Sequence, residues 1–186
     1  MFHFKIAALV FLAAIFLSAG LMAQDLPVSA PTIEHQILRN DVGVWDAKIR
    51  LFVNGPETDP VVVTGVETNK MLGDYWLISE LEYDLSGQKM IGRGQFGFDA
   101  NKKKFIGTWC DSSSPYMNYL EGEWDKSNNT WTYFLSGNDA EGNPIFSKMI
   151  TKIESKDRKT FEMYLKLPGD ESQYLKMMDV EYARQK

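Results

Sequence analysis

The stretch that decides the fold is GVWDAKIRLFV, residues 43–53, in which apolar and charged side chains alternate from Trp45 to Leu51. Trp45, Ala47, Ile49, Leu51 and Val53 share one parity, whereas Asp, Lys and Arg take the positions between the first four of them. Such alternation is typical of an antiparallel strand with one buried and one solvated face. It therefore predicts a strand whose Trp45 face turns toward the core.

Working outward from this strand, we find nine further stretches with the same period of two. The predicted strands cover residues 43–53, 61–69, 74–84, 90–98, 103–111, 116–124, 130–136, 144–154, 159–167 and 173–182. Gly, Asn, Asp and Pro separate most of them, as tight turns require. The connections are too short for parallel crossovers, so the sheet is expected to be an antiparallel meander.

A meander of about ten strands removes its exposed edges by closing on itself. The sequence therefore predicts an all-β fold, an antiparallel up-and-down β-barrel. A two-sheet sandwich with longer connections is the alternative. One short helix is expected between Pro31 and Asp41, with Thr32 as its cap and Glu34 in its first turn. This helix would cover one mouth of the barrel.

The N-terminus has the order of a secretory signal peptide. Lys5 is the only charged residue before Asp25, and an apolar run and small residues follow it. We expect a signal peptide over residues 1–23, with cleavage after Ala23 or, alternatively, after Gly20; a retained membrane anchor is the third option. Residues 24–32 would then be a flexible lead-in and residues 33–186 a single barrel domain. The protein is expected to be periplasmic or secreted, without stable membrane insertion after cleavage.

Composition excludes several classes of protein. The chain has 186 residues, a net charge of -5 and 13% aromatic residues. The acidic balance argues against nucleic acid as a partner, and the aromatic content argues against disorder. The single Cys110 permits neither an internal disulfide nor a thiolate metal cluster. His35 is the only histidine after the signal peptide, so no metal or cofactor is predicted, and we expect His35 to cap the helix or to form a hydrogen bond.

Two strands have mixed faces, and their carboxylates can be placed either way. Glu80 and Glu121 would face the lumen in one interpretation and the solvent in the other. Facing inward with Glu82 and Glu123, they could act as paired acids in an enzyme. Facing outward, they would simply be solvated.

The best candidate binding site lies where the fifth predicted strand ends. An aromatic face, a carboxylate, a hydroxyl and a thioether at one rim could orient a small ligand. Arg93, between two glycines, could reach Glu80 or an anionic group of the ligand. The predicted ligand-binding residues are Trp109, Asp111, Ser112, Tyr116, Met117, Glu80 and Arg93, and no residue is assigned a catalytic role.

The motifs in the middle of the chain resemble those of an uncharacterised bacterial family, the domain of unknown function numbered 1579. Gly94-x-Phe96-Gly97-Phe98-Asp99 is followed by Phe105-x-Gly107-x-Trp109-x-Asp111-Ser112, and the opening His35-x2-Leu38-x4-Gly43-x-Trp45 is similar as well. The resemblance covers roughly residues 33–183. Gly43-x-Trp45 also looks like the first strand of lipocalin-like barrels. The resemblance implies a calycin-like barrel, with Trp45 in a structural role, and it implies no activity.

The first functional hypothesis is therefore a binding protein that takes a small, partly apolar ligand into the lumen of the barrel. The alternatives are a structural or interaction protein of the cell envelope with a packed lumen, and an enzyme that uses lumen carboxylates. We expect a monomer or a weak homodimer.

Overall fold

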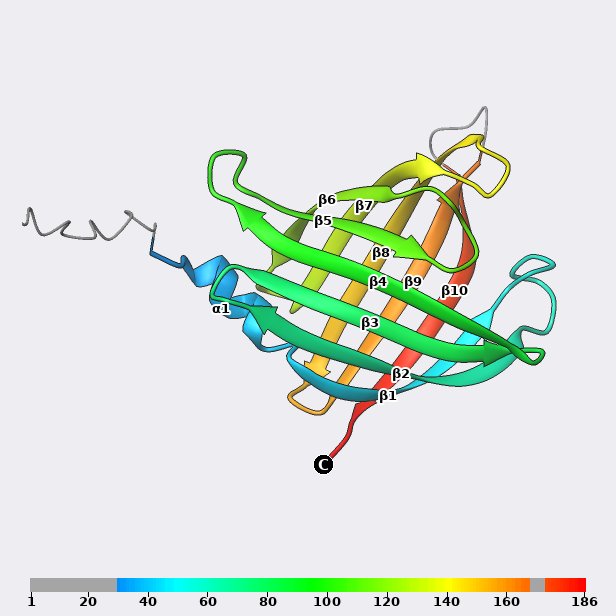
Figure 1. The fold of residues 1–186 in the computed structure, drawn as a ribbon, viewed down its shortest axis with the longest axis horizontal. Coiled ribbons are helices and arrows are strands. Elements are labelled where there is room, and N and C mark those ends of the chain that lie inside the picture. The colour runs from blue at the N-terminus through cyan, green and yellow to red at the C-terminus, as the bar shows by residue number, and fades with distance from the viewer. Residues whose placement is uncertain (1–29, 168–172) are drawn as a thin grey trace, which may run out of the picture. The chain divides into compact units, whose positions relative to one another are not determined.

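The computed structural model describes residues 30–167 and 173–186, whose ten strands close into one antiparallel barrel (Figure 1). Helix α1 precedes the strands. Each strand pairs with its sequence neighbour, and β10 closes the barrel on β1. The predicted up-and-down barrel is confirmed, and closure excludes the sandwich. The elements are α1 Ile33–Arg39, β1 Gly43–Leu51, β2 Val61–Leu72, β3 Trp76–Leu85, β4 Gln88–Asp99, β5 Lys104–Asp111, β6 Asn118–Asp125, β7 Thr130–Asn138, β8 Pro144–Ser155, β9 Arg158–Lys166 and β10 Tyr174–Arg184.

Residues 31–186 form one compact unit. The predicted signal peptide, residues 1–23, and the lead-in up to residue 29 lie outside the described residues. Among the described residues, we find no helix with the length and apolar character needed to span a membrane.

The turn between β2 and β3 is a feature that the sequence analysis did not assign. β2 continues to Leu72, and Gly73 then adopts a φ of +60°, a conformation that glycine reaches without steric cost. The third strand consequently begins at Trp76, two residues later than predicted.

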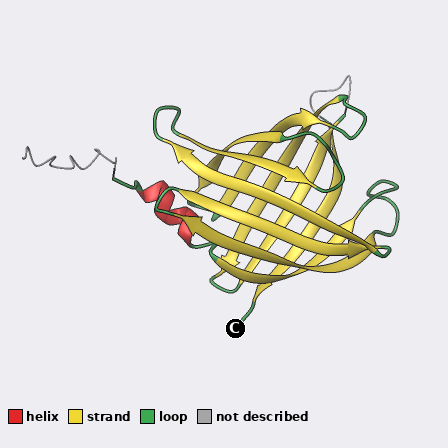
Figure 2. Ribbon diagram, viewed as in Figure 1, coloured by secondary structure: helices red, strands yellow, loops and turns green. Residues whose placement is uncertain are grey.

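Helix α1 packs against β3 and β4 at one end of the barrel (Figure 2). Its Leu38 is 2% exposed and joins a core cluster with Leu77 and Phe105. The ring of His35 accepts a hydrogen bond from the backbone N–H of Thr32 at 3.0 Å, which fixes the first turn of the helix. The expected capping role of His35 and the covered end of the barrel are therefore confirmed.

The structure confirms the predicted alternation of buried and outward-facing side chains in β1. Trp45, Ala47 and Ile49 are all buried inside the barrel. In β3 and β6 the structure decides the question that the sequence left open, because Glu80 and Glu121 lie on the outer wall. There Glu80 pairs with Arg93 of β4, and Glu121 pairs with a lysine of the turn between β4 and β5.

Candidate functional site

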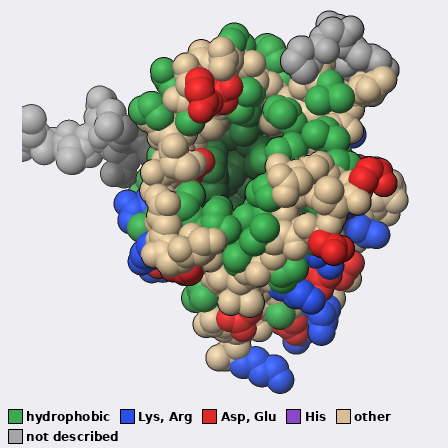
Figure 3. Space-filling model, turned by 90° about the vertical axis from the view of Figure 1, so that its right-hand side faces the viewer, with side chains coloured by type: hydrophobic (Ala, Val, Ile, Leu, Met, Phe, Trp, Pro, Cys, Tyr) green, Lys and Arg blue, Asp and Glu red, His purple; other side chains and the backbone are tan. Residues whose placement is uncertain are grey.

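A cavity of about 530 Å³ lies inside the barrel. Helix α1 is at the left of Figure 1, and Figure 3, which faces the right-hand side, shows hydrophobic side chains around a hollow. Cavities of this size hold small molecules. The residues that line it are mostly apolar and include Leu77, Leu81, Phe96, Trp109, Leu120 and Leu135.

The cavity stays open beside Trp109 because the neighbouring strand carries glycine at two inward positions. A Cβ atom on Gly92 would lie 2.2 Å from Cζ2 of Trp109, and one on Gly94 would lie 2.8 Å from its Cε3. The indole ring therefore lies along the barrel wall, in the space that two side chains of β4 would otherwise fill. The face of the indole ring that does not contact β4 is turned toward the lumen.

The floor of the cavity, at the end covered by α1, holds a buried lysine between two carboxylates. Lys159 Nζ lies 2.6 Å from Asp41 Oδ1 and 2.6 Å from Glu67 Oε1. Asn69 donates to the same two carboxylates, at 3.0 Å and 2.7 Å. Lys159 also lies 4.6 Å from the centre of the Trp45 ring, within the range of a cation–π contact. We call Asp41, Glu67, Asn69 and Lys159 the floor cluster.

Burial controls the protonation of the floor cluster. It raises the pKa of Asp41 from its usual 3.8 to about 6, although Lys159 pulls in the opposite direction. Burial alone would lower the pKa of Lys159, but the attraction of Glu67 and Asp41 outweighs it and raises that pKa. Lys159 is therefore an ammonium at neutral pH, and its charge is already matched inside the cluster.

Near the opposite end, Trp109 and Asp111 are inward residues of β5 and both line the cavity. Asp111 Oδ1 accepts hydrogen bonds from the backbone N–H of Ser113 at 2.9 Å and from its hydroxyl at 2.5 Å. Burial raises the pKa of the Tyr83 phenol, and the nearby Asp111 carboxylate raises it further. The structure thus brings Trp109, Asp111 and Tyr83 together at the mouth.

The other predicted site residues lie elsewhere. Ser112 joins the ends of β4 and β5, since its N–H donates to the Ile91 carbonyl at 2.8 Å and its hydroxyl accepts from the Ile91 N–H at 3.0 Å. Tyr116 and Met117 are 38% and 49% exposed in the loop after β5 and are not among the residues that line the cavity. Glu80 and Arg93 form their ion pair on the outer wall.

Sequence reasoning missed the floor cluster. One usable signal was present, because Lys159 has the same parity as the apolar residues Phe161, Met163 and Leu165 of the predicted strand 159–167, and all four line the cavity. Glu67 likewise shares the parity of Asn69, and both point inward. Asp41 gave no such signal, because it lies in the connection between α1 and β1.

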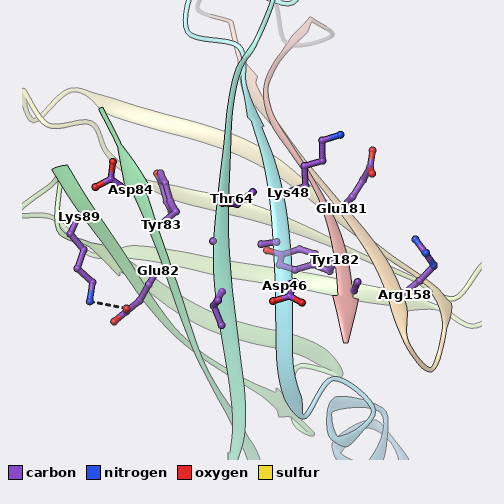
Figure 4. Close-up of a pocket in the computed structure, with 14 residues that line it drawn as sticks. Asp46, Lys48, Thr64, Glu82, Tyr83, Asp84, Lys89, Arg158, Glu181 and Tyr182 are labelled. Carbon is purple, nitrogen blue, oxygen red and sulfur yellow. Dashed lines mark ion pairs between the residues drawn. The ribbon is translucent and has the colours of Figure 1, made fainter. Parts of the chain in front are cut away.

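A second depression lies on the outer wall, where β1, β2, β3 and β10 meet (Figure 4). Outward-facing side chains of both charges border it, among them Lys48, Glu82, Lys89 and Glu181. Glu82 and Lys89 form an ion pair of 2.8 Å there. Charged side chains of both signs border this depression, and it is more open to solvent than the interior. We therefore take the interior as the candidate site.

No group of three or more His, Cys, Asp or Glu side chains among the described residues is placed to hold a metal ion.

A family model described as a protein of unknown function, DUF1579, matches residues 30–184. The chain belongs to this family. The resemblance found in the sequence is thereby confirmed. No curated protein matches the chain.

Three solved structures are similar to this family member to different degrees. Rv2717c from M. tuberculosis has a TM-score of 0.64 and 12% identity, over 84% of this chain and 100% of that chain. A redesigned β-barrel, b11L5F_LGL, has a TM-score of 0.41 and 12% identity, over 85% and 100%. The protein EF1p2_mFAP2b, solved bound to DFHBI, has a TM-score of 0.44 and 11% identity, over 82% and 99%. At these identities the likeness to Rv2717c concerns the fold alone.

Proposed function

We propose that the protein is exported and binds a small, partly apolar molecule inside the barrel. The observation that carries this proposal is the cavity of about 530 Å³ with its mostly apolar wall. Such a cavity leaves apolar side chains without packing partners, and a bound apolar molecule restores those contacts. The signal-like residues 1–23 are the basis for export to the periplasm or the medium.

Polar groups in the wall support a ligand that is not purely hydrocarbon. Asn118 Oδ1 and Trp131 Nε1 are buried and have no hydrogen-bond partner within the described part of the chain. Both residues line the cavity. Leaving a buried polar group unpaired costs about 1–3 kcal/mol, so such groups are usually paired in a functional complex.

The two alternative functions receive less support. A structural protein with a packed lumen would leave no cavity of this size. The enzyme hypothesis rested on Glu80 and Glu121 as lumen carboxylates, and both lie on the outer wall.

A pair of matched glycine variants tests binding in the interior. Gly92→Ala pushes the Trp109 ring into the lumen, whereas Gly97→Ala, on the same strand, meets the partly exposed outer ring of Trp76 at 2.6 Å. We expect Gly92→Ala to weaken the binding of N-phenyl-1-naphthylamine, a neutral fluorescent probe, at least tenfold, and Gly97→Ala to leave it unchanged. Equal affinities for the two variants would show that the probe binds outside the barrel.

Export and the natural ligand are tested together by native mass spectrometry of protein purified from the exported fraction. We expect a chain that starts at Gln24 and carries an additional mass that is lost on denaturation. A full-length chain that stays with the cells would contradict export.

A further inference from the structure

Negatively charged side chains outnumber positively charged ones around the cavity. Its described lining residues include four carboxylates but only one cation, Lys159. Lys159 is already held by two of the carboxylates, Asp41 and Glu67, at 2.6 Å each. An anionic ligand would therefore find no free cation there, and burying an unpaired charge is costly. A cationic ligand would instead find carboxylates, and some of these are not held by Lys159.

The two remaining carboxylates differ in how far they are satisfied. Both oxygens of Asp139 accept hydrogen bonds from Asn143, at 2.8 Å and 3.0 Å. Asp111 uses only Oδ1, for Ser113, and its Oδ2 has no partner among the described residues. The charge of Asp111 is not matched by any ion pair within the described chain. Asp111 is therefore the carboxylate available to a ligand.

An aromatic face lies beside this carboxylate. Trp109 is two residues before Asp111 on β5, so both side chains point into the barrel. One face of its ring lies on the backbone at Gly92 and Gly94, which turns the other toward the lumen. Among aromatic side chains, tryptophan attracts a cation most strongly.

Asn118 is a neighbouring polar residue whose amide oxygen points away from Trp109. Asn118 of β6 is the register partner of Trp109 and is 7% exposed. Its Oδ1 has no hydrogen-bond partner in the described residues, but it lies over Gly137 of β7, where a Cβ atom would be 1.8 Å from it. An ammonium site would therefore be formed by Trp109 and Asp111 without Asn118.

We propose that the ligand is a lipophilic amine, whose protonated nitrogen lies between Trp109 and Asp111 and whose apolar body fills the barrel. This proposal rests on the proposed binding function and specifies the chemical class of the ligand. The nitrogen sits near the mouth, and the apolar body reaches toward Leu77 and Leu120, which line the interior.

Three ten-carbon compounds that differ only in the head group test the proposal at pH 8: decylamine, decanol and decanoate. Each displaces N-phenyl-1-naphthylamine from the full mature chain, and its dissociation constant is measured. We expect decylamine to bind at least tenfold more tightly than decanol, with decanoate weakest. Decanol binding as tightly as decylamine would overturn the amine proposal and leave the proposed function standing. Failure of the probe and of all three compounds to bind would overturn both.

A matched pair of variants locates the nitrogen. Asp111→Asn keeps the acceptor for Ser113 and removes the charge, whereas Glu123→Gln makes the same change on the outer wall, where Glu123 pairs with Lys104. We expect Asp111→Asn to reduce the affinity for decylamine about tenfold and not to change that for decanol, and Glu123→Gln to change neither. An unchanged affinity of a folded Asp111→Asn for decylamine would overturn the assignment. The comparison of head groups needs no variant and decides the ligand class even if Asp111→Asn does not fold.

Discussion

The floor and the outer wall of the barrel contain the same kind of ion pair in opposite surroundings. Lys159 on the floor is 2% exposed and contacts Asp41 and Glu67 at 2.6 Å. Lys89 on the outer wall is 62% exposed and contacts Glu82 at 2.8 Å. The distances are similar, but water competes for the outer pair only. The energetic meaning of an ion pair is therefore set by its burial more than by its geometry.

Removal of the buried ammonium of Lys159 should produce the largest loss in the free energy of unfolding. Lys159→Met leaves Asp41 and Glu67 facing each other without a cation, and breaking a buried pair in this way costs about 3–5 kcal/mol. We expect that loss in the free energy of unfolding, measured by urea denaturation at pH 7. Lys89→Met, the outer control, should stay within about 1 kcal/mol of the wild type. Similar losses for both variants would mean that the floor cluster is hydrated.

The pH dependence of stability should reveal Asp41. Its pKa is raised from 3.8 to about 6 in the folded protein, so the native state binds more protons than the unfolded state between these values. The stabilising contribution of Asp41 is therefore complete below about pH 4 and is lost as the pH rises through 6. A shift of this size corresponds to about 3 kcal/mol, at 1.36 kcal/mol per pKa unit.

The variant Asp41→Asn isolates this contribution. We expect the free energy of unfolding of the wild type, relative to that of Asp41→Asn, to fall between pH 4 and pH 7, as measured by urea denaturation at each pH. Groups such as Asp125, whose pKa is lowered, affect both proteins equally and cancel in the difference. A difference that rises with pH would contradict a raised pKa for Asp41.

The contrast between buried and exposed charges also explains which parts of the structure the sequence could predict. Regular alternation in β1 identified the inner face correctly, because every inward position from Trp45 to Ile49 is apolar and every outward one is charged. In β3, Ser79 and Glu80 are both polar, so parity alone could not place Glu80. The floor cluster is harder still, since charged residues normally indicate an outer face and Lys159 is an exception.

The hollow itself could not be predicted from strand patterns. Gly92 and Gly94 accommodate Trp109 only because the register places Gly94 opposite Trp109 and Gly92 opposite Asp111. Register depends on the pairing of strands, which single-strand alternation does not specify. Trp109 and Asp111 were nevertheless predicted as neighbours at one rim, because they are two residues apart on a strand that was correctly assigned.

The smallest expected effect concerns the outer pair of Glu82 and Lys89, and it sharpens the contrast with the floor. In a double-mutant cycle of Glu82→Gln and Lys89→Met, the coupling energy should be at most about 1 kcal/mol, because both side chains are exposed and lose rotational freedom when they pair. Salt at about 1 M reduces the Debye length to about 3 Å, so the coupling should vanish there. The same cycle on Lys159 and Glu67, also measured by urea denaturation, should keep most of its coupling in salt, since counter-ions do not reach the floor. Equal salt sensitivity of the two cycles would mean that solvent enters the floor cluster, and burial would then no longer explain the raised pKa of Asp41.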